Sequence, residues 1–107
     1  CKAFWRRKLA EPPSPQAHAR FGAARAVRAA YTPEDVFARA GEAVRLAVVN
    51  GTCAIRLFAD VDEATGLRAL EGLFQVRAAF SPFLTVQVVA FPQDGFAGGT
   101  AALMEEA

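Results

Sequence analysis

Residues 52–96 decide the fold, and they read TCAIRLFAD (52–60), VDEATGLRALEGLFQVRAAFSPF (61–83) and LTVQVVAFPQDGF (84–96). The first and third segments have the composition of strands, whereas the second has the spacing of an amphipathic helix that closes at Ser81-Pro82. Two strands joined by about twenty residues of helical pattern predict a βαβ unit with parallel strands and a right-handed crossover. The chemistry of such units lies at the carboxyl ends of the strands.

Alternation along the two predicted strands assigns their residues to opposite faces of the sheet. Leu57 and Ala59 share an apolar face with Cys53, which places this cysteine in a buried strand. The opposite face is mixed, and its polar members are Arg56, Asp60, Gln87 and Gln93. A sheet covered on both sides is normally apolar on both faces, whereas a mixed face suits the interior of a (β/α) barrel near its mouth. The pattern therefore favours a barrel-like α/β unit.

The predicted strand ends carry acidic and amide side chains. Asp60, Asp62 and Asp94 are hard oxygen ligands that could hold a divalent cation, but carboxylates at these positions also cap helices and close turns. Arg56 shares a face with Asp60 and can pair with it or with Gln87. The amide of a glutamine such as Gln93 has both a donor and an acceptor, so it can pair with an amide-like ring edge.

Three segments together resemble the cytosine-deaminase-like branch of the amidohydrolase superfamily: AIRLFADVD (54–62), TGLRALE (65–71) and VQVVAFPQDG (86–95). The FPQ-acid-G loop after an LTVQVV-type strand is the most specific part of this likeness. The resemblance extends upstream through residues 31–36 and 50–52, and it is weak over the first thirty residues.

The resemblance implies a portion of a metal-dependent (β/α)8 TIM barrel that hydrolyses amino or amide groups on pyrimidine- or triazine-like rings. It implies that Gln93 matches the loop glutamine that reads the amide edge of the ring, and that Asp60 matches the acidic residue at the end of the second barrel strand. These two residues, with Arg56 on the same face, are the candidate substrate-binding residues.

No catalytic residue and no metal ligand is assigned within the chain. Phe58 stands where this branch usually has a histidine. The family's HxH pair would lie just before Cys1, and its later histidines and aspartate belong to other strands of the barrel. The zinc or iron of the full-length family is therefore not expected in this chain, and the resemblance implies inactivity of the chain in isolation.

Length and composition predict one folded domain over residues 1–107, with 1–30 as an N-terminal arm and 31–107 as a partial barrel unit. The chain has 107 residues, of which 53% are hydrophobic and 21% charged, which is typical of globular chains and short of a full barrel. A net charge of +1 supplies no electrostatic argument for nucleic acid or an anionic membrane. The apolar runs are also too short to span a bilayer.

The two cysteines, Cys1 and Cys53, allow at most one bridge, and the second lies in a predicted strand. We therefore expect a reduced thiol and a cytoplasmic location. The basic Arg6-Arg7-Lys8 run and the single histidine, His18, are more typical of a solvated surface than of a binding site.

Helix signals flank the βαβ unit. Residues 17–30 suggest a short helix whose Phe21, Ala24 and Val27 share one side. A clearer helix begins after Thr32 as the cap, with Pro33 in its first turn, and ends at 50–51 (Asn-Gly). The crossover helix is expected over about residues 63–79, capped by Asp62 or Thr65. A last short helix is expected from Thr100 to Ala107.

Two functional classes follow from these observations. The first is an amidohydrolase-like portion that keeps Gln93 and acts on a small heterocycle when the rest of the barrel supplies the metal. The second is a non-catalytic α/β remnant or assembly module. Because two strands leave open edges and cannot close a barrel, we expect a second copy of the chain or the remainder of a barrel to cover them.

Overall fold

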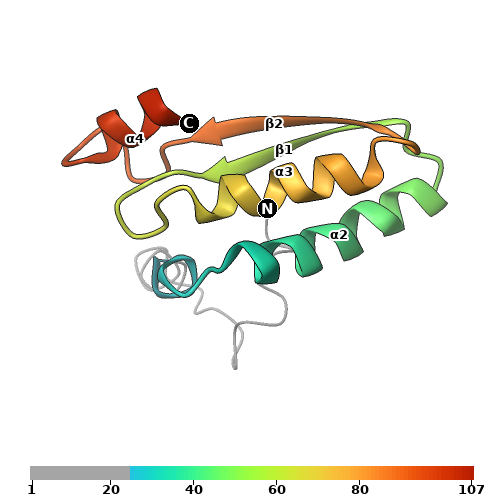
Figure 1. Cartoon of the computed structure of the whole chain (residues 1–107), viewed down its shortest axis with the longest axis horizontal. Coiled ribbons are helices and arrows are strands. Elements are labelled where there is room, and N and C mark those ends of the chain that lie inside the picture. Colours follow the sequence, from blue (N-terminus) through green and yellow to red (C-terminus); the bar gives the residue numbers. More distant parts are fainter. Residues whose placement is uncertain (1–24) are drawn as a thin grey trace, which may run out of the picture.

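The computed structural model of the chain describes residues 25–107, which contain a two-stranded sheet and the helices packed against it (Figure 1). The elements follow in the order α2 (Pro33–Val49), β1 (Ala54–Asp60), α3 (Arg68–Phe80), β2 (Thr85–Phe91) and α4 (Thr100–Glu106). Residues 25–29 are also helical. The predictions made for Cys1, for the basic run at 6–8, for His18 and for the first part of the helix at 17–30 lie outside the described residues.

The two strands pair in parallel, from Ala54 opposite Thr85 to Asp60 opposite Phe91, with α3 connecting them. This confirms the predicted βαβ unit and its mixed α/β class. One further backbone hydrogen bond, from the amide of Val61 to the carbonyl of Phe91 at 2.9 Å, extends the pairing past the strand ends. Both strands therefore deliver the residues that follow them to one edge of the sheet.

Both long helices lie on the same side of the sheet (Figure 1). Helix α3 packs against both strands and α2 packs along α3. The core between these layers combines residues of α2, α3 and the strands: Val36, Ala40, Val44, Leu57, Ala59, Leu70, Leu73, Val76 and Val86. The apolar sheet face predicted from Leu57, Ala59 and Val86 is confirmed, because all three side chains are buried.

The other face of the sheet is not covered by any helix of residues 25–107 (Figure 1). Phe58 and Phe91 are 49% and 42% exposed there, and their rings meet edge to face with centroids 6.2 Å apart. Arg56 donates from Nε to Oε1 of Gln87 at 2.7 Å, which confirms one of the two pairings considered for this arginine. The mixed face is thus open to solvent in the described structure.

The start and end of α2 match the sequence signals. The side chain of Thr32 accepts a hydrogen bond from the amide of Asp35 at 3.2 Å, and Pro33 occupies the first turn. After the helix, Gly51 has a φ of 87°, a left-handed conformation that glycine adopts without a steric penalty. Local residue chemistry is enough to set both ends of this helix.

The crossover helix begins later than predicted, at Arg68 instead of residue 63. The backbone amide of Gly66 donates to the carbonyl of Asp62 at 2.7 Å, and Gly66 has a φ of 59°. A left-handed residue cannot continue a right-handed helix, so α3 starts only after it. The prediction that Asp62 or Thr65 caps this helix is wrong, because the N-cap residue is Leu67 and it makes no side-chain cap bond.

The prediction that Cys53 lies in a buried strand is also wrong. The strand begins one residue later, at Ala54, and Cys53 is an exposed free thiol. Alternation alone put it on the apolar face, but alternation does not show where the strand begins. The predicted last helix is present as α4, from Thr100 to Glu106.

Gly72→Ala should lower the free energy of unfolding by about 1–3 kcal/mol, the usual effect of overpacking a close contact. A Cβ at position 72 of α3 would lie 2.6 Å from the carbonyl oxygen of Pro33 and 2.7 Å from Cβ of Val36, both in α2. Denaturant unfolding followed by circular dichroism measures the change.

Gly41→Ala, in the middle of α2, is the matched control. Its Cβ would meet only the Phe80 ring at 3.6 Å, an ordinary contact. Because alanine loses less backbone entropy than glycine in a helix, we expect a gain of about 0.5–1 kcal/mol. Similar effects of the two substitutions would contradict the close approach of α2 and α3 at Gly72.

Candidate functional site

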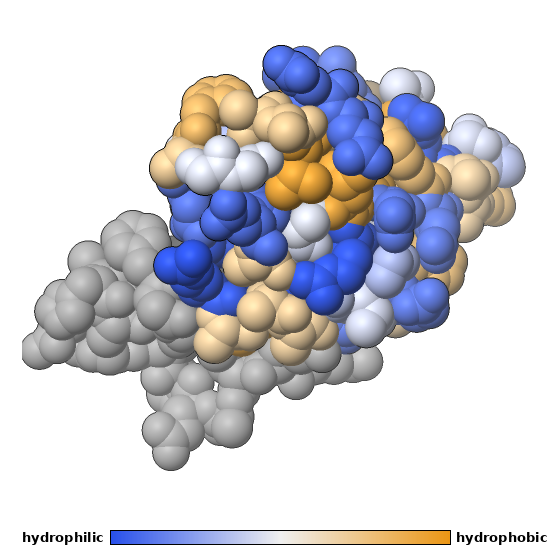
Figure 2. Space-filling model, turned by 60° about the vertical axis from the view of Figure 1, so that its left-hand side comes forward, coloured by the Kyte–Doolittle hydropathy of each residue, from blue (hydrophilic) through white to orange (hydrophobic). Residues whose placement is uncertain are grey.

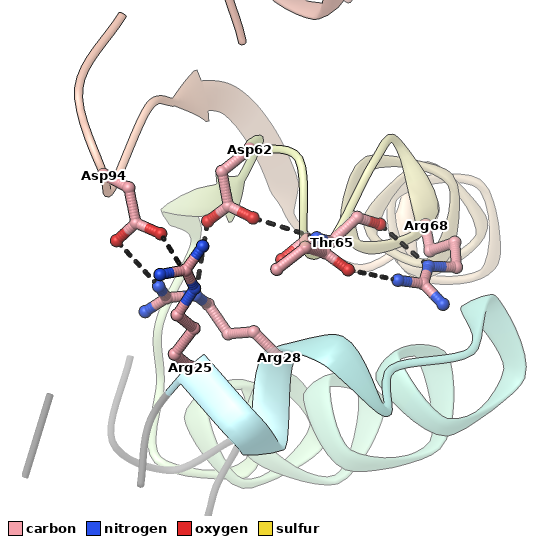
Figure 3. A network of polar contacts seen from close by, with 7 residues as sticks. Arg25, Arg28, Asp62, Thr65, Arg68 and Asp94 are labelled. Atoms are coloured by element: carbon pink, nitrogen blue, oxygen red, sulfur yellow. Dashed lines mark hydrogen bonds and ion pairs between the residues drawn. The ribbon is translucent and has the colours of Figure 1, made fainter. Parts of the chain in front are cut away.

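The candidate site lies at the carboxyl ends of the strands, where the loops after β1 and β2 meet the helical residues 25–29. Figure 2 turns this end of the molecule toward the reader and shows hydrophilic side chains grouped around a smaller hydrophobic area. Figure 3 shows the polar contacts within it, with Arg28 between Asp62 and Asp94. Three segments far apart in sequence therefore contribute to one cluster.

Arg28 is the centre of this cluster. Its Nε lies 3.3 Å from Oδ2 of Asp62, and its Nη2 donates to Oδ1 of Asp94 at 2.9 Å. The side chains of Arg28 and Asp62 are only 3% and 1% exposed, whereas that of Asp94 is 41% exposed. Because a buried charge without a partner is costly, removal of either Arg28 or Asp62 would leave an unpaired charge at this end of the fold.

The loop after β1 holds Asp62 in place. Oδ1 of Asp62 accepts a hydrogen bond from the amide of Thr65 at 2.9 Å, a local turn that aspartate side chains commonly stabilise. At the start of α3, Arg68 donates from Nε to the carbonyl of Thr65 at 2.8 Å. The carboxylate that faces Arg28 is therefore fixed by the turn and by the helix behind it.

Asp60, the last residue of β1, is half-buried beside this cluster. Burial raises the pKa of its carboxyl above the ordinary value of 3.8, and the attraction of Arg28 opposes this shift only in part. The negative charges of Asp62 and Asp94 act in the same direction as burial. Asp60 therefore keeps its proton to a higher pH than an unperturbed aspartate does.

Gln93 lies in the turn after β2, next to Asp94. The amide of Gly95 donates to the carbonyl of Pro92 at 3.0 Å and closes this turn, and Gly95 has a φ of 79°. The side chain of Gln93 is exposed and makes no hydrogen bond with any other residue of the range 25–107. Its amide is consequently available to a ligand at the strand ends.

Arg56 is not brought to the same place as Asp60 and Gln93. It precedes Asp60 by four residues on β1, a distance of about 13 Å along a strand. Its guanidinium is bonded to Gln87, and it lines a shallow hollow of about 630 Å³ at the other end of the sheet with Thr85 and Arg77. Asp60 and Gln93 both lie at the carboxyl ends of the strands, and Arg56 lies apart from them.

A pocket of about 230 Å³ adjoins the cluster. Its walls combine the two strand-end loops with the start of α4: Arg25, Asp62, Glu63, Ala64, Asp94, Ala97, Gly98 and Thr100. Glu63 closes one side, since its Oε1 accepts a hydrogen bond from the amide of Gly99 at 2.5 Å. Three carboxylates and one arginine line this pocket, so it suits a small polar ligand.

The three aspartates do not form a cation site. Among residues 25–107, no group of three or more histidine, cysteine, aspartate or glutamate side chains is placed to hold a metal ion. Instead of a metal, the guanidinium of Arg28 lies between Asp62 and Asp94. These residues therefore do not fit the zinc or iron that the family resemblance implies.

Arg28 is not among the predicted site residues, although the sequence carries a signal for it. Phe21, Ala24 and Val27 were expected to share the apolar side of a helix, and Arg28 follows Ala24 by four residues and Phe21 by seven. Residues at these spacings lie on the same side of a helix. An arginine on an apolar side indicates a buried ion pair, but the sequence does not say with which carboxylate.

Comparisons with known proteins add no relative, since no protein-family model and no curated protein matches this chain. Within residues 25–107, none of the helices has both the length and the apolar composition needed to cross a membrane. The functional argument therefore depends on the geometry of the strand ends.

Asp60→Asn should raise the free energy of unfolding at neutral pH. Because burial raises the pKa of Asp60 in the folded protein, its ionised form destabilises the fold above that raised value. This penalty disappears as the pH falls below the ordinary value of 3.8, where the carboxyl is protonated in both states. Thermal melts of Asp60→Asn and of the unmodified chain, from neutral pH to below pH 3.8, measure the difference in stability. If the stability gained by the substitution does not decrease as the pH falls, the raised pKa of Asp60 is contradicted.

Proposed function

We propose that residues 31–107 are two consecutive βα units of a (β/α)8 barrel of the amidohydrolase superfamily, from its cytosine-deaminase-like branch. In this proposal the chain supplies the part of the mouth that reads the ring of a pyrimidine- or triazine-like substrate. The observation that supports the proposal is the exposed amide of Gln93, which follows β2 in a tight turn at the same edge of the sheet as Asp60 and makes no hydrogen bond within residues 25–107.

The arrangement of the layers supports a barrel. In a (β/α)8 barrel every helix lies outside the sheet and the inner face carries the side chains that meet the substrate. Here α2 and α3 lie on one side, and the open side carries Arg56, Gln87 and the two aromatic rings of Phe58 and Phe91. A polar and aromatic inner face of this kind is compatible with the lining of a substrate cavity.

The proposal assigns binding to this chain and hydrolysis to a larger assembly. A family enzyme hydrolyses its ring substrate with a metal-activated water, and residues 25–107 do not provide the ligands for that metal. What they provide is an amide with both a donor and an acceptor at Gln93, and a carboxyl at Asp60 whose pKa is raised. The exposed free thiol of Cys53 is compatible with a reducing, cytoplasmic location.

A titration of the ¹⁵N-labelled chain with cytosine tests this function. We expect the amide signals of Asp60 and of residues 93–95 to shift first, because they surround the proposed ring site. Gln93→Ala should weaken the binding on the order of tenfold, the usual effect of losing a polar contact to a buried ring edge.

Gln75→Ala is the control, since Gln75 is an exposed glutamine on α3, away from the strand ends. Unchanged signals at 93–95 at saturating cytosine, or an equal effect of the two substitutions, would exclude the ring-reading role. Release of ammonia from cytosine by this chain with added zinc or iron would contradict the assignment of the metal site to other strands.

A second candidate function, a non-catalytic module that self-associates, is favoured by the open sheet face. Phe58 and Phe91 present a paired aromatic surface there, and aromatic side chains are enriched at protein interfaces. The outer edges of the two strands also lack a neighbouring strand among residues 25–107. Such edges are typical sites of pairing with another chain.

Light scattering coupled to size-exclusion chromatography at micromolar concentration tests this second function. We expect the double substitution of Phe58 and Phe91 by serine to convert a dimer into a monomer, because it removes the aromatic surface. Phe83→Ser is the control, since Phe83 is 68% exposed but precedes the strand. A compact monomer for the unmodified chain would exclude self-association through this face.

A further inference from the structure

The turn that carries Gln93 has little packing of its own. Residues 93–99 are all exposed, and Pro92 is only half-buried. One backbone hydrogen bond, between Gly95 and Pro92, closes the turn. Segments with few buried contacts and exposed hydrogen bonds open locally at low free energy. If the amide of Gln93 is to form hydrogen bonds with a ring, some other contact must therefore hold this amide in one place.

We infer that Arg28 is a positioning residue for Gln93, acting through an ionic latch formed by Arg28, Asp62 and Asp94. This inference rests on the proposed function only in giving Gln93 a ligand to read. The latch joins the turn after β2 to the buried end of the fold, because Asp94 is the neighbour of Gln93 and accepts from Nη2 of Arg28 at 2.9 Å.

The anchored side of the latch is rigid. Arg28 and Asp62 are buried, and Asp62 is held by the amide of Thr65. Arg68 then ties the carbonyl of Thr65 to the first turn of α3 (Figure 3). The carboxylate of Asp94, at 41% exposure, is the exposed end of the latch.

Only an arginine fits the central position of the latch. Two different nitrogens of its planar guanidinium form ion pairs with two carboxylates: Nε with Asp62 and Nη2 with Asp94. A lysine ammonium is a compact point charge and lacks this fork, so it can keep the charge without keeping the geometry. The contacts thus predict that Arg28→Lys does not replace arginine in the latch.

A second tie holds the other end of the same loop. Glu63 accepts from the amide of Gly99, and Gly98 approaches it so closely that a Cβ there would lie 2.3 Å from Oε1 of Glu63. The pocket of about 230 Å³ is bounded by both ties, with Asp94 and Gly98 among its lining residues. The latch therefore controls the end of the loop near Gln93, and Glu63 controls the end near α4.

Amide hydrogen exchange in the purified chain tests the latch without any ligand. Asp94→Ala should speed the exchange of the Gly95 amide on the order of tenfold. The reason is that loss of one charge-assisted hydrogen bond to a buried partner shifts the opening equilibrium of the turn by about that factor. The exchange of the Gly99 amide should change little, since Glu63 holds it separately. The midpoint of thermal unfolding should stay close to that of the unmodified chain, because the Arg28–Asp62 pair remains.

Arg25→Ala is the matched control, since its Nε lies 4.0 Å from the same carboxylate but its side chain is 66% exposed. We expect no change in the exchange of Gly95 for this variant, and faster exchange for Arg28→Lys with the helices still folded by circular dichroism. Unchanged exchange in Asp94→Ala, or the same increase in Arg25→Ala, would overturn the latch.

Each of the two proposals can be contradicted without the other. If Asp94→Ala loosens the Gly95 amide but cytosine never shifts the signals of residues 93–95, the latch stands and the ring-reading function is wrong. If cytosine binds and Asp94→Ala leaves both its affinity and the exchange of Gly95 unchanged, the function stands and the latch is wrong. If both hold, we expect Asp94→Ala to weaken cytosine binding on the order of tenfold, the same factor by which it loosens the turn.

Discussion

Parallel pairing of β1 with β2 is the constraint on which the rest of this structure depends. Two parallel neighbours need a crossover, and α3 fulfils that need while covering one face of the sheet. The same pairing brings the two strands to an end side by side, so the loops that follow them share one edge. The polar contacts of the candidate site come from this edge, from the start of α3 and from the helical residues before α2.

Three carboxylates lie close together at that edge, and the positive charge of Arg28 reduces the repulsion between them. Asp60, Asp62 and Asp94 would repel one another in a partly buried setting. The buried guanidinium neutralises part of this charge, and it does so with two separate nitrogens toward Asp62 and Asp94. Asp60 keeps a raised pKa because burial outweighs the attraction of Arg28 for its carboxylate. The site thus contains both an internal ion pair and a carboxyl whose pKa is raised by burial.

The two faces of the sheet differ in burial and in composition. The face toward α3 is a packed core, and on the other side of α3 the glycine at position 72 allows α2 to approach closely. The opposite face carries a hydrogen-bonded Arg56–Gln87 pair and two half-exposed rings, a composition that suits a barrel interior or an interface. This uncovered face supports the proposed barrel portion, and it is also the surface from which the alternative, a self-associating module, is argued.

The sequence by itself determined the features that depend on local chemistry: the βαβ order, the capped start of α2 at Thr32, its glycine stop at Gly51, and the apolar face of Leu57 and Ala59. Caps, turns and alternation involve neighbours in the chain, so their physics can be read from spacing.

Only the tertiary structure decided which residues meet across the fold. It buried Arg28 between two aspartates, delayed α3 to Arg68 by closing a turn at Gly66, and left Cys53 exposed. It also separated Arg56 from Asp60 and Gln93, which the pattern had grouped together. These outcomes depend on contacts between segments 30 or more residues apart and on loop geometry, and spacing along the chain does not encode them.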